Sequence, residues 1–191
     1  MALAMLSQDE KRELLHIARG AIACELQRRV YQPPTTGTSG LHEVRGVFVT
    51  LRVDRELRGC IGYIESKKPL FHVVAEVAVK AAFDDPRFPP MTTEEFENAT
   101  IEISILSPLE RISSSNEIEI GTHGLVVACG PRRGLLLPQV AIEHELDRQE
   151  FLDATFQKAG LAISRQYSSD VEIYSFQAEV VHENDFVVGK A

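Results

Sequence analysis

The strongest constraint on the fold is a pair of alternating apolar segments separated by a short polar turn. Apolar side chains occupy every second position of residues 47–53, and a second apolar segment, residues 57–64, follows the turn Asp54-Arg55-Glu56. A two-residue period sends successive side chains to opposite faces of a strand. Two such segments joined by a polar turn are typical of a β-hairpin. The sequence therefore predicts an antiparallel sheet that contains this hairpin.

The same order of elements recurs in the second half of the chain. Residues 125–129 and 135–137 flank the turn at residues 131–134, and each hairpin precedes a proline, Pro69 or Pro138, and then a helical segment. Recurrence in a fixed order is typical of a duplicated unit. We therefore expect a hairpin–helix duplication in which both hairpins belong to one curled, barrel-like, mainly antiparallel sheet flanked by helices.

Helical periodicity and capping signals place helices between the predicted strands. Ser7 and Glu10 have the spacing of a capping box, which predicts a helix from near Gln8 to near Val30. Further helices are expected at residues 69–81, 93–98, from 139 and 148–159, and further strands at 101–106, 118–120 and 171–182. The predicted fold class is α+β, with a single domain over residues 1–191 that could consist of two closely packed lobes.

The net charge of the chain argues against a nucleic-acid partner. Its 28 Asp and Glu residues exceed its 20 Lys and Arg residues, which gives a formal net charge of −8. Binding to a phosphate backbone depends on clustered Lys and Arg that neutralise it. We therefore expect neither DNA nor RNA as a partner.

Cysteine usage and hydropathy indicate a reduced, cytoplasmic protein. Cys24, Cys60 and Cys129 are odd in number and include no Cys-x-x-Cys pair, which disfavours a disulfide framework and a four-cysteine zinc site. No apolar run is long enough to span a bilayer, and the short apolar start of the sequence lacks the basic region of a signal peptide. We expect no membrane association and no metal site.

The segment Leu57-Arg58-Gly59-Cys60-Ile61-Gly62 is the part of the chain most indicative of chemistry. Strand alternation predicts that Arg58, Cys60 and Gly62 share one face. Gly59 and Gly62 would let a ligand or another backbone approach closely. The guanidinium of Arg58 would favour the reactive thiolate, whereas burial would raise the thiol pKa. Cys60 is therefore either an activated or ligand-binding thiol or a small buried hydrophobe, as a free cysteine commonly is.

Four other polar residues are candidates for the same site. Glu102 and Ser104 share the polar face of their predicted strand, which meets either solvent or a cleft. His123 lies between glycines in a turn and could be an acid, a base or a ligand, or simply a tolerated turn residue. Arg87 could bind an anion beside an aromatic wall, although such a segment commonly only ends a helix. No P-loop, His-Glu-x-x-His, Gly-x-Ser-x-Gly or dinucleotide fingerprint is present, so no cofactor is identified.

These segments together resemble the AMMECR1 family, and the resemblance extends over nearly the whole chain from the first helix onward. The segment at residues 57–62 is its centre, and the other matching segments are residues 81–88, 101–104, 121–125, 134–140, 151–152 and 158–161. The resemblance implies an α+β fold with a cleft lined by the glycine–cysteine motif. It also implies Memo-like and radical-SAM proteins as partners in a shared pathway of redox or modification chemistry.

Two functional interpretations follow. In the first, the protein is an enzyme or an enzyme component in which Cys60 is the nucleophile or thiol ligand, Arg58 holds the thiolate or an anionic substrate, and His123 and Glu102 transfer protons. In the second, the protein is a non-catalytic adaptor whose motif binds a peptide or a small ligand. The sequence leaves the substrate and the reaction open between the two.

Overall fold

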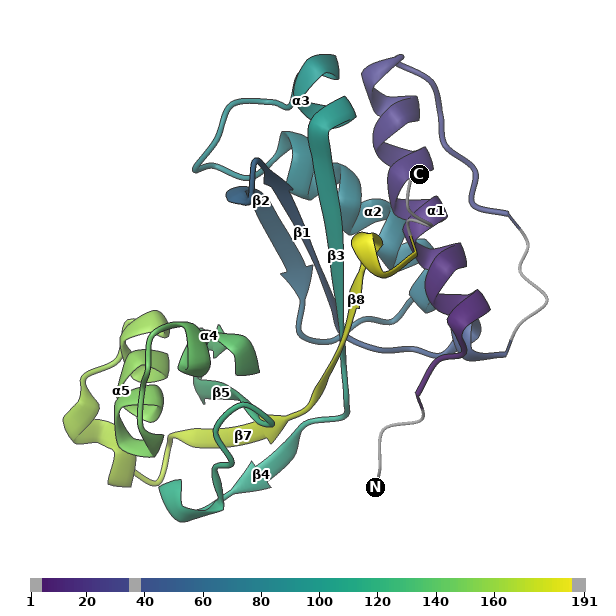
Figure 1. The fold of residues 1–191 in the computed structure, drawn as a ribbon. Helices are drawn as coiled ribbons and strands as arrows, with labels where there is room; N and C mark the ends of the chain where they lie inside the picture. Colours follow the sequence, from purple (N-terminus) through teal and green to yellow (C-terminus); the bar gives the residue numbers. More distant parts are fainter. Residues whose placement is uncertain (1–4, 35–38, 187–191) are drawn as a thin grey trace. The chain divides into compact units, whose positions relative to one another are not determined.

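The computed structural model describes residues 5–34 and 39–186 of the 191-residue chain. The chain divides into two compact units, of which the first comprises Met1–Ile105 and Glu179–Ala191 and the second comprises Leu106–Ala178. Each unit contains its own sheet (Figure 1), four-stranded in both cases. Each also has its own hydrophobic core. The α+β class and the antiparallel pairing expected from the sequence are confirmed.

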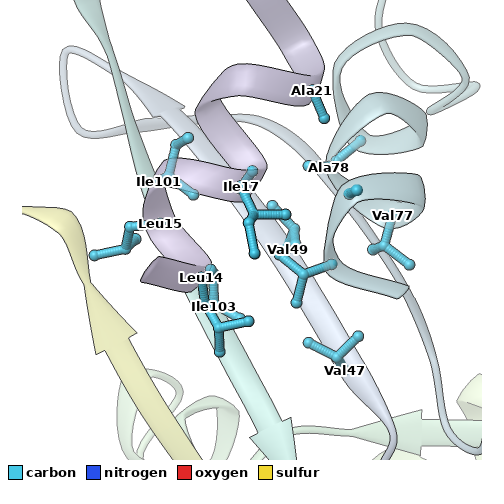
Figure 2. Packing of buried hydrophobic residues seen from close by; sticks show 14 of the residues in the cluster. Leu14, Leu15, Ile17, Ala21, Val47, Val49, Val77, Ala78, Ile101 and Ile103 are labelled. Carbon is cyan, nitrogen blue, oxygen red and sulfur yellow. The ribbon is translucent and has the colours of Figure 1, made fainter. Parts of the chain in front are cut away.

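In the first unit, helices α1 and α2 pack against one face of a sheet with the strand order β2-β1-β3-β8 (Figure 1). Its helices are α1 (Gln8–Leu26), α2 (Leu70–Phe83) and α3 (Thr93–Asn98), and its strands are β1 (Val47–Val53), β2 (Glu56–Tyr63), β3 (Ala99–Leu106) and β8 (Ala178–His182). Alternate strand residues face the helices. Val49 of β1, Ile103 of β3, and Leu14 and Ile17 of α1 meet in this core and are almost completely buried (Figure 2).

The ends of the elements in the first unit follow local signals. The capping box between Ser7 and Glu10 forms as predicted and starts α1 at Gln8. The helix ends at Leu26 rather than near Val30, because Arg28 adopts a left-handed conformation with φ of 54° that cannot continue a helix. The hairpin turn between β1 and β2 is also left-handed at two positions, Asp54 and Arg55, with φ of 52° and 70°. Positive φ at both central residues is the geometry that matches the twist of a two-residue hairpin.

The second unit has the strand order β4-β7-β5-β6 and a separate core. Its strands are β4 (Glu110–Ile112), β5 (Gly124–Cys129), β6 (Arg132–Leu136) and β7 (Glu172–Phe176), and its helices are α4 (Pro138–Glu143) and α5 (Arg148–Lys158). Helix α5 packs on β5 and β6 and buries Phe151 and Phe156 completely. Gly160 ends this segment with φ of 67°, as expected for a glycine after a helix.

Three expectations about the strands are wrong. The two hairpins lie in two separate sheets rather than in one curled sheet. Residues 118–120 form no strand and follow a 3-10 helix, Ser115–Glu117. The predicted strand at 171–182 is broken at Gln177, so that β7 belongs to the second sheet and β8 to the first. Alternation reports which face a side chain takes, but not which sheet a strand joins.

The order of hairpin, proline and helix does recur, once in each unit. Strands β1 and β2 precede Pro69 and α2, and strands β5 and β6 precede Pro138 and α4. In the described parts of the chain, no helix is long and apolar enough to cross a membrane.

Candidate functional site at the edge of the first sheet

Cys60 lies on β2, the edge strand of the first sheet. The pairing with β1 places Thr50 opposite Cys60 and Leu51 opposite Gly59, and then shifts so that Arg52 pairs with Leu57. Arg58 is the extra residue of this irregularity, a β-bulge. The alternation that predicted Arg58 and Cys60 on one face is therefore interrupted between them.

A row of polar side chains crosses the face of the sheet opposite α1 and α2, called here the outer face. Thr50 pairs with both Cys60 and Glu102, because β1 lies between β2 and β3. The hydroxyl of Thr50 donates to Cys60 Sγ at 3.3 Å. Beyond Glu102, His182 of β8 places Nδ1 3.3 Å from Glu102 Oε2. The structure thus brings Cys60 and Glu102 to the same face, about 10 Å apart across two strand spacings.

Asp85 and Arg87 hold the backbone of Cys60 at the open edge of the sheet. The Cys60 N–H donates to Asp85 Oδ2 at 2.9 Å, and Arg87 Nη2 donates to the Cys60 carbonyl at 3.3 Å. The two side chains also pair with each other, with 2.7 Å between Arg87 Nη2 and Asp85 Oδ2. An edge strand exposes unpaired N–H and C=O groups to which a further strand could pair. At Cys60, Asp85 and Arg87 provide the hydrogen-bond partners for these groups instead.

The side chain of Arg58 makes its hydrogen bonds with Glu95 and Pro89 rather than with Cys60. Its Nε and Nη2 lie 2.7 and 3.0 Å from the two carboxylate oxygens of Glu95, and Nη2 also donates to the carbonyl of Pro89 at 2.9 Å. The guanidinium groups of Arg58 and Arg87 lie 5.7 and 5.5 Å from the centre of the Phe88 ring. The arginine next to the thiol is therefore Arg87, and Arg58 ties the bulge of β2 to α3.

Burial decides the ionisation of Cys60. Burial raises the pKa of the thiol above its ordinary value of 9.0. The hydrogen bond from Thr50 and the charge of Arg87 lower the pKa, whereas the negative charges of Asp85 and Glu102 raise it. The net direction is upward, so the thiol is protonated at neutral pH. Of the two opposing effects expected from the sequence, desolvation outweighs the arginine.

Both glycines of the motif are places of close approach. A Cβ atom on Gly59 would lie 2.0 Å from the carbonyl oxygen of Ala81 in α2. A Cβ atom on Gly62 would lie 2.2 Å from the ring of Phe48 on β1. Gly59 thus lets β2 pack against the helix, and Gly62 makes room for an aromatic side chain on the outer face. A ligand-binding role for either glycine stays a prediction.

Ser104 lies on the outer face and pairs with Phe48 across β1 and β3. It is 1% exposed, and its hydroxyl has no hydrogen-bond partner. A buried hydroxyl without a partner costs free energy in the folded state. A ligand-binding role for Ser104 stays a prediction.

His123 belongs to the second unit, whereas Cys60 belongs to the first. Its Nδ1 accepts a hydrogen bond from the backbone N–H of Glu119 at 3.2 Å, and the backbone N–H of His123 donates to the Glu119 carbonyl at 2.8 Å. These contacts close the turn before β5 and agree with a structural role. A role for His123 in proton transfer to Cys60 stays a prediction.

Thr50, Asp85 and His182 contribute to the site but were not predicted from the sequence. Thr50 could have been found from the hairpin, because pairing around the turn brings it near Cys60. Asp85 and His182 gave no such signal, since each reaches the row through a contact between distant segments. Within the described residues, no group of three or more His, Cys, Asp and Glu side chains could hold a metal ion.

The chain is therefore a two-unit α+β protein with a cysteine on an edge strand whose backbone groups are held by Asp85 and Arg87. The family profile for AMMECR1 matches residues 15–181, and the chain belongs to this family. A protein of Methanothermobacter thermautotrophicus is 43% identical over 96% of this chain and 100% of its own length. A protein of Methanopyrus kandleri is 44% identical over 94% and 91%. The crystal structure of an uncharacterised protein from Pyrococcus horikoshii matches with a TM-score of 0.86 and 38% identity, covering 92% of each chain.

Proposed function

We propose that the outer face of the first sheet binds a ligand beside Cys60 and that the protein catalyses or supports a thiol-dependent reaction there, with Cys60 as nucleophile or thiol ligand. The observation that carries the proposal is the clamp on Cys60. Asp85 and Arg87 hold both backbone polar groups of this residue, while Thr50 contacts its sulfur. A cysteine that only filled space would not need a hydrogen bond to its sulfur and charged side chains on its backbone.

The charges around the site favour a neutral or cationic ligand over an anion. Arg58 is neutralised by Glu95, and Arg87 by Asp85. Glu102, whose Oε2 lies 3.3 Å from His182 Nδ1, acts on Cys60 as a negative charge and raises the pKa of its thiol. A cationic ligand would also lower the pKa of Cys60 toward the reactive thiolate by offsetting the charge of Glu102.

Methanethiosulfonate reagents of opposite charge test this proposal. The cationic aminoethyl reagent should modify Cys60 faster than the anionic sulfonatoethyl reagent at pH 8, as measured by mass spectrometry of the three cysteine peptides. Glu102→Gln should reduce this preference at Cys60 about fivefold, because it removes roughly 1 kcal/mol of charge interaction. Cys24 and Cys129 serve as internal controls whose preference should not change.

The result would count against the thiol proposal if Cys60 resisted both reagents while Cys24 and Cys129 reacted. It would also do so if Glu102→Gln left the charge preference of Cys60 unchanged. In the first case, the second candidate function takes its place, that of a non-catalytic adaptor or ligand-binding module. The raised pKa of Cys60 favours that candidate, since a thiol protonated at neutral pH is a weak nucleophile.

The proposal includes partners and a location that rest on the family resemblance and on the composition. Memo-like and radical-SAM proteins are the proposed partners in a redox or modification pathway. The cytoplasm is the proposed location, where all three cysteines would stay free thiols, as they are in the structure. Co-purification of wild type and of Cys60→Ser with a Memo-like protein tests the partnership. If neither form co-purified with it, the result would count against the partnership.

A further inference from the structure

His182 adds to the polar row a side chain that can change its charge near neutral pH. It lies on β8, which is beside β3 at the edge of the sheet opposite β2 (Figure 1). Its Nδ1 lies 3.3 Å from Glu102 Oε2, and its side chain is 51% exposed, against 15% for Glu102. The imidazole therefore exchanges protons directly with water. Histidine is the side chain whose charge ordinarily changes between pH 5 and pH 8.

The charge of Glu102 acts on the thiol of Cys60 across the intervening strand. Thr50 of β1 pairs with both residues, and the negative charge of Glu102 raises the pKa of the thiol. A protonated imidazole beside Glu102 offsets this negative charge, whereas a neutral imidazole does not. The protonation of His182 therefore changes the electrostatic field in which a ligand beside Cys60 would bind.

The other charged side chains close to His182 have partners of their own. Glu183, the next residue, forms an ion pair with Arg19 of α1, which packs on the other face of the sheet. Arg52 lies on the outer face of β1, but its guanidinium donates to a backbone carbonyl of the hairpin turn at 3.4 Å. Of these charged groups, Glu102 is the one within ion-pair distance of the imidazole.

We propose that His182 sets the charge specificity of the ligand site beside Cys60 and makes it dependent on pH. With a neutral imidazole, Glu102 favours a cationic ligand, and protonation of the imidazole removes most of this preference. Binding of a cation and binding of a proton then oppose each other, so that a cationic ligand displaces the proton of His182. This inference rests on the ligand site proposed above and adds the residue that regulates it.

Two thiol reagents whose charges do not depend on pH test this inference. The trimethylammonioethyl and sulfonatoethyl methanethiosulfonates are compared from pH 5.5 to pH 8 by mass spectrometry of the Cys60 peptide. Both react with the thiolate, so the ratio of their rates cancels the change in its concentration. Glutamates ordinarily stay ionised over this range. The preference for the cationic reagent should rise about threefold toward pH 8, less than the effect of Glu102→Gln, because an imidazolium offsets the carboxylate only in part.

Two variants fix the charge at position 182. His182→Gln is neutral at every pH, so it should show the high preference of the wild type at pH 8 throughout. His182→Arg is cationic at every pH, so it should show the low preference of the wild type at pH 5.5 throughout. His72→Gln is the matched control, since it changes an exposed histidine of α2, the helix on the other face of the sheet. It should keep the pH dependence of the wild type.

The inference is overturned if the preference of the wild type is constant over this range, or if His182→Gln shows the same rise. A constant preference that Glu102→Gln still reduces would leave the proposed ligand site standing and remove only the role of His182. If Cys60 reacted with neither reagent while Cys24 and Cys129 reacted, the ligand site itself would fail, and this inference with it. Circular dichroism at each pH confirms that the variants are folded.

Discussion

At the scale of single residues, Cys60 shows how burial and charge compete. Because burial raises the pKa of its thiol, we expect the iodoacetamide reaction rate of Cys60 to reach half its maximum above pH 9.0, the ordinary thiol value. Arg87→Gln should move this midpoint upward, because the charge of Arg87 lowers the pKa, and Glu102→Gln should move it downward. Mass spectrometry of the Cys60 peptide between pH 7 and 11 measures these rates.

Arg55→Gln is the control for this pH profile, since it changes an exposed arginine in the hairpin turn. Circular dichroism at each pH confirms that the protein stays folded. A Cys60 midpoint below pH 9 in the wild type would contradict the predicted direction of the shift.

Gly59 gives a second prediction at this scale. Its substitution by alanine places a Cβ atom 2.0 Å from a backbone oxygen of α2, which cannot move away without shifting the helix. Overpacking of this kind typically costs about 1–3 kcal/mol. Gly62→Ala meets the ring of Phe48, which can partly turn away, and the Val47 carbonyl oxygen at 2.5 Å rather than 2.0 Å, so it should also destabilise, but less. Urea unfolding of both variants gives the free energies.

Gly130→Ala separates the two reasons why a position requires glycine, namely a close contact at the Cβ position and a positive φ. A Cβ atom at Gly130 has nothing within 4 Å, but φ is 56°, so this variant has only the cost of a left-handed backbone, about 1 kcal/mol. If Gly59→Ala were no more destabilising than Gly130→Ala, the close approach of β2 to α2 would not be the reason for this glycine.

At the scale of elements, the clamp on the edge of β2 predicts a pH dependence. The pKa of Asp85 is lowered from 3.8 to about 2, chiefly by hydrogen bonds from Arg87. A carboxylate with a lowered pKa contributes stability that is fully present above its unfolded value and is lost as the pH falls through the folded value. The contribution of Asp85, about 2 kcal/mol by this shift, should therefore disappear between pH 4 and pH 2.

Asp85→Asn tests this contribution. The variant should be less stable than wild type at pH 7, and the difference should shrink as the pH falls from 4 to 2. Some acid sensitivity should remain, because the pKa values of Glu76 and Glu95 are also lowered to about 2. Thermal unfolding in steps of half a pH unit measures it, with Arg55→Gln as control. A constant difference between Asp85→Asn and wild type across this range would rule out the charge of Asp85 as its cause.

At the scale of the whole molecule, the net charge of −8 predicts no binding of consequence to DNA or RNA at physiological salt. Two arginines of the described structure that could contact phosphate are already neutralised by carboxylates, Arg19 by Glu183 and Arg58 by Glu95. Filter binding with mixed-sequence duplexes and single strands measures this. Micromolar affinity that falls steeply as salt is added would contradict it.

The sequence alone was sufficient for the features that depend on neighbouring residues. The capping box of α1, the first hairpin around residues 54–55 and the end of α5 at Gly160 appear where local signals predicted them. The second hairpin also forms, but its turn lies at residues 130–131 rather than 131–134, because β6 already begins at Arg132. Family membership could also be recognised, because it rests on the order of short motifs. Such features follow from local backbone sterics and hydrogen bonds, which a short stretch of sequence largely specifies.

Only the tertiary structure decided which segments meet. It divided the strands between two sheets, and it broke the strand at Gln177, where the N–H of Ser107 donates to the Gln177 carbonyl at 2.8 Å. In the tertiary structure, Arg58 pairs with Glu95, and Asp85 accepts a hydrogen bond from the Cys60 backbone. The physical reason is that these partners are chosen by burial and register across long sequence separations. A bulge of one residue in β2 was enough to change which arginine lies beside the thiol.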